Sequence, residues 1–452
     1  MTDTLLGGQR GHGTLLAHGI GGPQDLPIPA GYAFTGAALA LLISFAVLGL
    51  AWRTPRFRGD ASGRPLPKWL AGFINSPITR FVVVLLALVF TAWITMAAVF
   101  GSETLVNPTF GAVFALLWVG LVPAALLFGR VYRLCNPLRW IHRGIAAAAA
   151  TDPRAGLRAY PDRWGYWPAA AFLFGFVSLE LVDPNTSTSL SAVRLWFAVI
   201  AALLVAGAAV FGDTFFARAD PFEVYSSLVA RLSPFGRRTD GVLVVRNPLE
   251  NLDGQRPRPG LVAVVAVLFG STAFDSFKES ARWVRFSFHF TGHVVLLNTV
   301  ALLVFCAIVF VTFSLASVAT GRIGGIDRRG LPDLMAHSVV PIVVGYIVAH
   351  YLSFFVATGL GTLQLLGDPL SRGWTLTSFL DGINKFAIYQ HPTALAVTKV
   401  VAIVTGHVLG IIAAHDRAVR LLPKRHVIVG QLPMLVLMVA YTLTGLFLLF
   451  SS

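Results

Sequence analysis

The chain alternates between long apolar runs and shorter polar connections. Two of the runs, 34–52 and 81–100, hold no charged residue. A helix that spans a bilayer needs roughly 20 such residues, whereas the strands of a membrane barrel are shorter and alternate between apolar and polar positions. The pattern therefore predicts an all-α integral membrane protein.

Repetition of these runs predicts a bundle of about ten transmembrane helices. We expect the helices at 32–53, 79–100, 110–131, 165–183, 192–212, 259–275, 289–318, 333–360, 393–415 and 430–450. They divide the chain into an extracytoplasmic N-terminal arm (1–31), a first five-helix half (32–212), a cytoplasmic loop (213–258) and a second five-helix half (259–452). Two polar segments, 132–163 and 213–258, are long enough for short surface helices.

Composition supports lipid as the main solvent of this chain. Hydrophobic residues make up 56% of the sequence and charged residues only 12%, against roughly 25% charged residues in soluble domains. Buried in lipid, a backbone must satisfy its own hydrogen bonds, and helices do so within one segment. The lipid bilayer is thus the first predicted partner.

Lys and Arg residues are concentrated in the connections between the apolar runs. Of the 35 Lys and Arg residues, 26 lie in or beside the connections after the first, third, fifth, seventh and ninth runs. Cytoplasmic loops carry this excess, so the sequence predicts both termini outside and a multi-pass location in the bacterial inner (plasma) membrane. Topology thereby explains the net charge of +14 without a nucleic-acid partner.

Histidines are the most distinctive candidates for chemistry. His289 and His293 are four residues apart at the outer mouth of the seventh run, and this spacing favours one helical face and one metal ion. His350 lies inside the eighth run, and the short connection between these runs predicts that the two helices are neighbours. With His391 as a further ligand, we expect a divalent metal site; the alternative is interfacial or interhelical histidines.

Two carboxylates extend this outer set. Glu180 ends the fourth run and Asp275 ends the sixth, and either is expected to bridge the metal or act as a catalytic base. Lys399, two turns into the ninth run, is a candidate to neutralise one carboxylate of the outer side.

Other histidines form an inner set on the opposite side. His337 and His407 lie at that depth, and Gly406 and Gly410 flank His407 with the spacing that allows close helix approach. The motif HDR at 415–417 is interpreted as a solvated helix end. Two separated sets of histidines fit a pathway as well as they fit one active site.

Short sequence words resemble a bacterial polytopic membrane family whose members are often named fenitrothion hydrolase. The words are HG at 18–19, DLPIP at 25–29, WPAA at 167–170, LELV at 179–182, RAD at 218–220, VY at 224–225, ARLSP at 230–234, HS at 337–338, PI at 341–342, GY at 345–346, AHY at 349–351, GH at 406–407 and AHDR at 414–417. The resemblance implies hydrolysis of an organophosphorus triester at its aryl-ester bond, but no catalytic residues to carry over.

Three function classes follow. The first is a metal-dependent hydrolase that acts on organophosphorus or related aryl esters as small-molecule substrates, with the metal activating water. The second is a transporter or metal-handling protein whose histidines and carboxylates line a path. The third is a haem-binding membrane oxidoreductase, for which His293 and His350 are the candidate axial pair.

Overall fold

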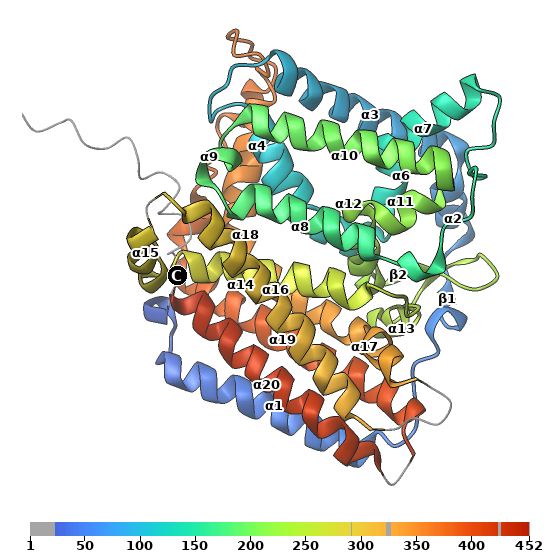
Figure 1. The fold of residues 1–452 in the computed structure, drawn as a ribbon, viewed down its shortest axis with the longest axis vertical. Helices are drawn as coiled ribbons and strands as arrows, with labels where there is room; N and C mark the ends of the chain where they lie inside the picture. Colours follow the sequence, from blue (N-terminus) through green and yellow to red (C-terminus); the bar gives the residue numbers. More distant parts are fainter. Residues whose placement is uncertain (1–22, 291, 322–326, 424–425, 452) are drawn as a thin grey trace, which may run out of the picture.

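The computed structural model describes residues 23–290, 292–321, 327–423 and 426–451, and it is predominantly helical (Figure 1). The N-terminal arm is described only from Pro23, so His18 of the HG word lies outside the described residues. The long helices are α1 (Ala30–Ala51), α3 (Pro77–Phe100), α8 (Trp167–Leu181), α10 (Leu190–Phe211), α14 (Leu261–Lys278), α16 (Val294–Ala319), α18 (Val340–Leu365), α19 (Pro392–Leu421) and α20 (Val427–Ser451).

Shorter elements connect them. They are α2 (Lys68–Asn75), α4 (Pro108–Gly111), the π-helix η3 (Ala112–Val119), α5 (Leu121–Phe128), α6 (Val131–Cys135), α7 (Pro137–Ala148), α9 (Pro184–Ser187), α11 (Thr214–Ala219), α12 (Pro221–Val229), α13 (Pro248–Asp253), α15 (Ala281–Ser287), α17 (Leu331–Met335), and the 3₁₀ helices η1 (Pro23–Asp25), η2 (Gly59–Ala61), η4 (Asp162–Trp164), η5 (Ala230–Leu232), η6 (Phe288–Phe290), η7 (Arg328–Gly330), η8 (Ala336–Val339), η9 (Ser378–Leu380) and η10 (Ala387–Gln390).

A helix or a broken helix lies at each of the ten predicted positions. Eight helical segments of the described chain are long and apolar enough to cross a membrane, and a ninth joins them if the pair 108–119 and 121–128, bent by 43°, is one span. The remaining helix, α8, has 15 residues, which is shorter than the usual spanning length. The all-helical class is therefore confirmed, whereas the number of spans is not.

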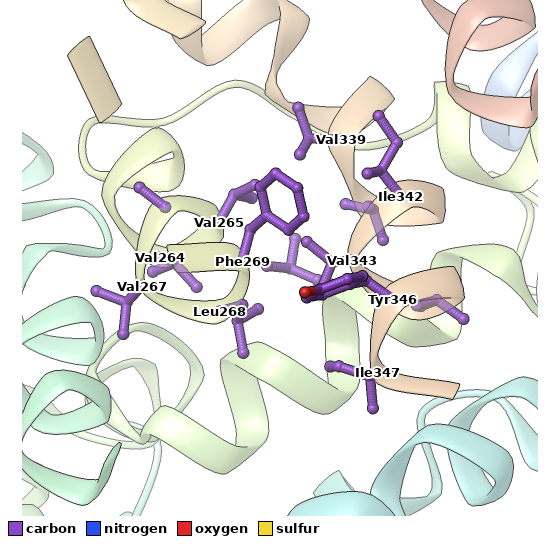
Figure 2. Packing of buried hydrophobic residues seen from close by; sticks show 14 of the residues in the cluster. Val264, Val265, Val267, Leu268, Phe269, Val339, Ile342, Val343, Tyr346 and Ile347 are labelled. Atoms are coloured by element: carbon purple, nitrogen blue, oxygen red, sulfur yellow. The ribbon is translucent and has the colours of Figure 1, made fainter. Parts of the chain in front are cut away.

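Helix α14 forms the centre of the bundle. The sequence marks it as the shortest run, yet 89% of its apolar window is buried within the protein, and its side chains pack on all sides. Figure 2 shows one such contact, where Val265 and Phe269 of α14 face Ile342, Val343 and Tyr346 of α18. A helix that is apolar all round belongs inside a bundle.

The central position of α14 corrects one prediction. We expected the helices before and after the short connection at 321–332 to be neighbours, but α16 packs mainly on α14 and α20, and α18 packs mainly on α19 and η3. Both contact α14, which is the shared partner because most of its surface is apolar. His293, which directly precedes α16, and His350 of α18 therefore lie on chain segments that are not each other's main packing partners.

Glycines bring α18 and α19 into backbone contact. A Cβ built at Gly406 would lie 2.6 Å from the carbonyl oxygen of Pro341, and one at Gly345 would lie 2.4 Å from that of Ala402. A Cβ at Gly410 would meet the carbonyl oxygen of Ser338 at 2.7 Å. The close approach predicted from the pair Gly406 and Gly410 is thus confirmed.

The segment 213–258 differs from a surface loop. Helix α12 is buried almost throughout its length and packs against α5, α6, α8 and α18, so the expectation of surface helices is wrong for this part. The reason is its composition, since Phe222, Val224 and Tyr225 supply apolar surface on several faces. Farther along, β2 (Phe235–Arg237) and β3 (Leu243–Val245) pair antiparallel with each other, and β3 also pairs with β1 (Arg64–Pro65).

Gly406→Ala is predicted to destabilise the protein. The new methyl group must displace the backbone carbonyl of Pro341, and overpacking of this kind costs about 1–3 kcal/mol. Thermal denaturation of the purified protein in detergent should show a lower midpoint. The matched control is Gly36→Ala on α1, where a Cβ meets nothing within 4 Å; equal midpoints for both variants would contradict the tight contact.

Candidate functional site

Asp275 and His350, both predicted from the sequence, meet inside the bundle. Asp275 lies in the last turn of α14 and His350 in the middle of α18, with 5% and 4% of their surfaces exposed. The Nε2 atom of His350 is 3.0 Å from Oδ2 of Asp275. Ionisable groups within apolar helices point into the bundle and pair with one another, and this pair follows that rule.

The carboxylate of Asp275 has three partners. Besides His350, Oδ2 accepts a hydrogen bond of 2.6 Å from the hydroxyl of Tyr351, and Oδ1 lies 3.2 Å from Nζ of Lys278 on the next turn of α14. An opposite charge and two donors stabilise the ionised carboxylate in an apolar surrounding. Asp275 therefore acts as a fixed negative charge at this point of the bundle.

Ser276 completes the surroundings of the imidazole. Its Oγ lies 3.1 Å from Nδ1 of His350, 3.0 Å from the hydroxyl of Tyr346 and 3.3 Å from the backbone carbonyl oxygen of Thr272. With Asp275 ionised, Nε2 of His350 carries the hydrogen that it donates to the carboxylate. In neutral His350 the Nδ1 atom is then an acceptor, and the Ser276 hydroxyl donates to it.

The same partners accommodate a protonated imidazole. When Nδ1 gains a proton it becomes a donor, and the Ser276 oxygen accepts from it if the serine hydroxyl turns toward the carbonyl of Thr272. One hydroxyl rotation therefore satisfies both protonation states of His350 without moving a helix. The order serine, histidine, aspartate is also that of a nucleophile, a general base and an orienting carboxylate.

Glu180 brings a second carboxyl group to this cluster. It lies on α8, close enough to Asp275 and Lys278 for their charges to interact, and its Oε2 atom is buried without a hydrogen-bond partner among the described residues. Most buried polar atoms are paired with protein or water. Glu180 thus adds a position where the cluster is able to hold a proton or a water molecule.

Further charges face the cluster from α19 and from the end of α14. Lys399 is buried and interacts with Asp25 and Glu279, whereas the sequence suggested a carboxylate of the outer set, such as Glu180 or Asp275, as its partner. Glu279, directly after α14, interacts in turn with His350 and Asp275, and burial raises the pKa of Glu279 to about 7. The charged groups around His350 thus come from α8, α14 and α19.

The predicted metal ligands are not collected into one site. Helix α16 begins at Val294, directly after His293, and His289 lies in η6, where its Nδ1 atom contacts the carbonyl oxygens of Arg285 and Phe286. The helical face expected for this pair is therefore absent from the described structure. His289, His293 and His391 are all exposed.

The donor set does not fit a metal or a haem at His350. Both ring nitrogens of His350 already face protein partners, Ser276 and Asp275, and ligation would have to break one of these contacts. Within the described ranges, no three His, Cys, Asp or Glu side chains are grouped so that they could hold a metal ion. The interhelical hydrogen-bonding alternative describes His350 best.

The inner histidines also have local partners. Nδ1 of His407 lies 2.8 Å from the carbonyl oxygen of Ile403 on its own helix, and His415 contacts Gln431 and the carbonyl oxygen of Trp52. The solvated helix end expected at 415–417 is wrong. Asp416 is fully buried and accepts from the Trp52 indole, while Arg417 pairs with Asp253 at 3.0 Å, so this helix end ties two connections to the bundle.

A second buried polar cluster was not predicted from the sequence. Arg139 of α7 forms two hydrogen bonds with Glu223 of α12, at 2.6 and 2.7 Å, and Asn136 donates to Asp220 at 2.8 Å. All four side chains are buried. Burial and the neighbouring Glu223 raise the pKa of Asp220 to about 7. The sequence does carry one signal for these positions, an Asn or Asp directly before a proline at 136–137 and 220–221. This pattern is typical of helix N-caps.

Aromatic side chains connect the first cluster to α12, the helix that carries part of the second. Trp118 of η3 interacts with Tyr351 of the first cluster, and its ring centroid is 5.2 Å from that of Tyr225 on α12. The Tyr225 hydroxyl is buried and has no hydrogen-bond partner in the described part of the chain. Glu223 belongs to the same helix, two residues earlier.

Comparison of the chain with protein-family models, curated proteins and solved structures finds no match. The resemblance to the family named fenitrothion hydrolase therefore stays a prediction.

Asp275→Asn is predicted to lower the free energy of unfolding by about 3 kcal/mol, because it leaves the Lys278 ammonium without its opposite charge. Unfolding of the purified protein in detergent measures the loss. The double variant D275N/K278M should recover part of it, since both charges are then removed. Asp381→Asn, at an exposed position outside the cluster, is the control; an equal loss there would contradict the pairing.

Proposed function

We propose that the chain is a multi-pass membrane transporter that moves protons, with His350 as the group that takes up and releases the proton. The observation that carries this proposal is the surrounding of His350. Ser276 faces one ring nitrogen and Asp275 the other, and one hydroxyl rotation serves both protonation states. Chains of His and acidic residues within apolar helices are typical of proton relays.

Access to His350 from one end of the bundle is supported by Lys278. Its side chain is 26% exposed, whereas that of Asp275 is 7% exposed, so the cluster borders on solvent at the end of α14. Glu180 provides a second carboxyl group beside it. A proton that enters here meets the imidazole after one or two transfers.

A route toward the opposite end is supported by the aromatic bridge and the second cluster. Trp118 interacts with Tyr351 of the first cluster and with Tyr225 of α12, the helix that also carries Glu223. A buried hydroxyl such as that of Tyr225 commonly bonds an internal water, and such waters carry protons between side chains. Asp220 is itself buried, but the neighbouring Glu223 lies 3.8 Å from Arg133, whose side chain is 53% exposed, so we place the proposed cytoplasmic exit at this cluster.

The membrane arrangement that we propose has ten spans and both termini outside, in a bacterial inner membrane. Helix α1 begins and α20 ends at the same end of the bundle (Figure 1), and this supports an even number of crossings. The three strands and α13 lie toward the other end, together with connections that carry most of the positive charge. In this arrangement α8 crosses as a short helix beside α14.

Reporter fusions test the arrangement. Fusions at Asp60, Asp152 and Asp240 are expected to give a cytoplasmic signal, because they lie in connections rich in Lys and Arg. Fusions at Glu103, Asp183 and Asp368 should give an external signal. A cytoplasmic signal at Asp183 would show that α8 does not cross the membrane, and the proposed even number of crossings would then be wrong.

Hydrolysis is the second candidate function. It is favoured by the hydrogen-bonded order of Ser276, His350 and Asp275, which matches an activated nucleophile without a metal. Ser276 is fully buried, so an ester would reach it only after the helices move apart. This is the weaker candidate, because proton transfer needs no such opening.

Proton flux into proteoliposomes tests the proposed function. With an imposed pH gradient and a pH-sensitive dye inside, the purified chain should acidify the lumen faster than protein-free liposomes do. His350→Ala should lower this rate at least tenfold, since no other group in the cluster has two ring nitrogens to pass the proton. His391→Ala, which changes an exposed histidine, should leave the rate unchanged.

Two outcomes would reject the transporter. One is a wild-type rate equal to that of protein-free liposomes, and the other is an equal rate for wild type and His350→Ala. Turnover of an aryl phosphotriester that is lost in Ser276→Ala would then support the hydrolase instead.

A further inference from the structure

Two arginines share one acceptor at the end of the bundle that holds the strands. Nη2 of Arg80 lies 3.1 Å from Oδ1 of Asn75, and Nη2 of Arg237 lies 2.7 Å from the same oxygen. Arg80 is in the first turn of α3, Asn75 ends α2 and Arg237 ends β2. Two consecutive helices and a strand distant in sequence thus hold two guanidinium groups side by side.

The two positive charges are not neutralised by the described residues. No carboxylate of that part of the chain forms an ion pair with Arg80 or Arg237, and the second partner of Arg237 is the carbonyl oxygen of Gly241. Burial lowers the pKa of Arg237, and the nearby charge of Arg80 lowers it further. Both side chains are exposed, so each retains donors for an external anion.

An apolar surface lies next to this arginine pair. Trp69 and Phe73, four residues apart on α2, are 74% and 62% exposed, and Ile78 and Phe81 at the start of α3 are 75% and 65% exposed. Helix α2 contacts chiefly α3. A short helix with exposed aromatic residues on one face and cationic neighbours is typical of a segment that lies in the membrane interface.

We infer that Arg80 and Arg237 bind the phosphate of an anionic phospholipid, whose acyl chains cover the apolar surface of α2 and α3. Guanidinium groups form paired hydrogen bonds with phosphate oxygens. The oxygen of Asn75 holds the two groups at a separation that one phosphate is able to bridge. This inference concerns a site at the other end of the bundle from His350, and it does not depend on proton transport.

The adjoining apolar surface selects a lipid over free phosphate as the ligand. Inorganic phosphate would satisfy the guanidinium groups but leave Trp69, Phe73 and Ile78 facing water. A phospholipid binds the guanidinium groups with its phosphate and covers the apolar side chains with its acyl chains. Helix α3 continues from this surface, and only 17% of its apolar window is buried by the protein. The headgroup site and the lipid-facing surface are therefore continuous.

Titration of the full chain in detergent with phosphatidylglycerol, followed by native mass spectrometry of the retained lipid, tests the inference. The wild type should retain phosphatidylglycerol more tightly than phosphatidylcholine. The double variant R80Q/R237Q should bind phosphatidylglycerol about thirtyfold more weakly, as expected from the contribution of two basic side chains near an anionic surface. Its phosphatidylcholine binding should fall less, because the choline group of that lipid already neutralises the charge of the phosphate.

The matched control is R328Q/R329Q, which removes the same charge from two exposed arginines of η7. An equal loss in this control would overturn the site, because general charge would then explain the binding. Trp69→Ala with Phe73→Ala should also weaken phosphatidylglycerol binding while the melting midpoint stays within a few degrees. If excess inorganic phosphate displaces the lipid completely, or if R80Q/R237Q binds as the wild type does, the lipid assignment is rejected.

Discussion

An apolar bundle must balance every charge that it buries, and this constraint organises the interior of the protein. Helix α14 occupies the centre because its side chains are apolar on every face, and only in its last turn does it carry Asp275, Ser276 and Lys278. The partners of these groups come from the helices packed around α14. Tyr351 and His350 of α18 bond the carboxylate, while Lys278 balances its charge.

The same constraint explains why α12 lies inside the protein although it follows a polar connection. Asp220 and Glu223 enter the interior only together with Asn136 and Arg139, which provide an amide and a guanidinium group. Breaking such a buried pair costs far more than an exposed ion pair contributes. Two clusters built from different helices thus follow one electrostatic rule.

Apolar periodicity predicted the helical class, the approximate position of each long helix and the glycine contact of α19, because these depend on local sequence. Asp275 and His350 were also identified, since an ionisable group within an apolar run is conspicuous. The sequence placed both in one outer set, but it did not give their direct hydrogen bond, because that depends on α14 lying against α18. Ser276, a common residue in any helix, gave no signal, and His289 and His293 misled because a helix was assumed to begin before Val294.

The glycine contact between α18 and α19 has a mechanical consequence. Because the backbones touch at Gly345, Gly406 and Gly410, no layer of side chains separates α18 from α19 there, and this contact resists sliding of one helix along the other. His350 belongs to α18, whereas Asp275 and Ser276 belong to α14 and Glu180 belongs to α8. Any movement of α18 relative to α14 would therefore change the distances between the imidazole and its partners.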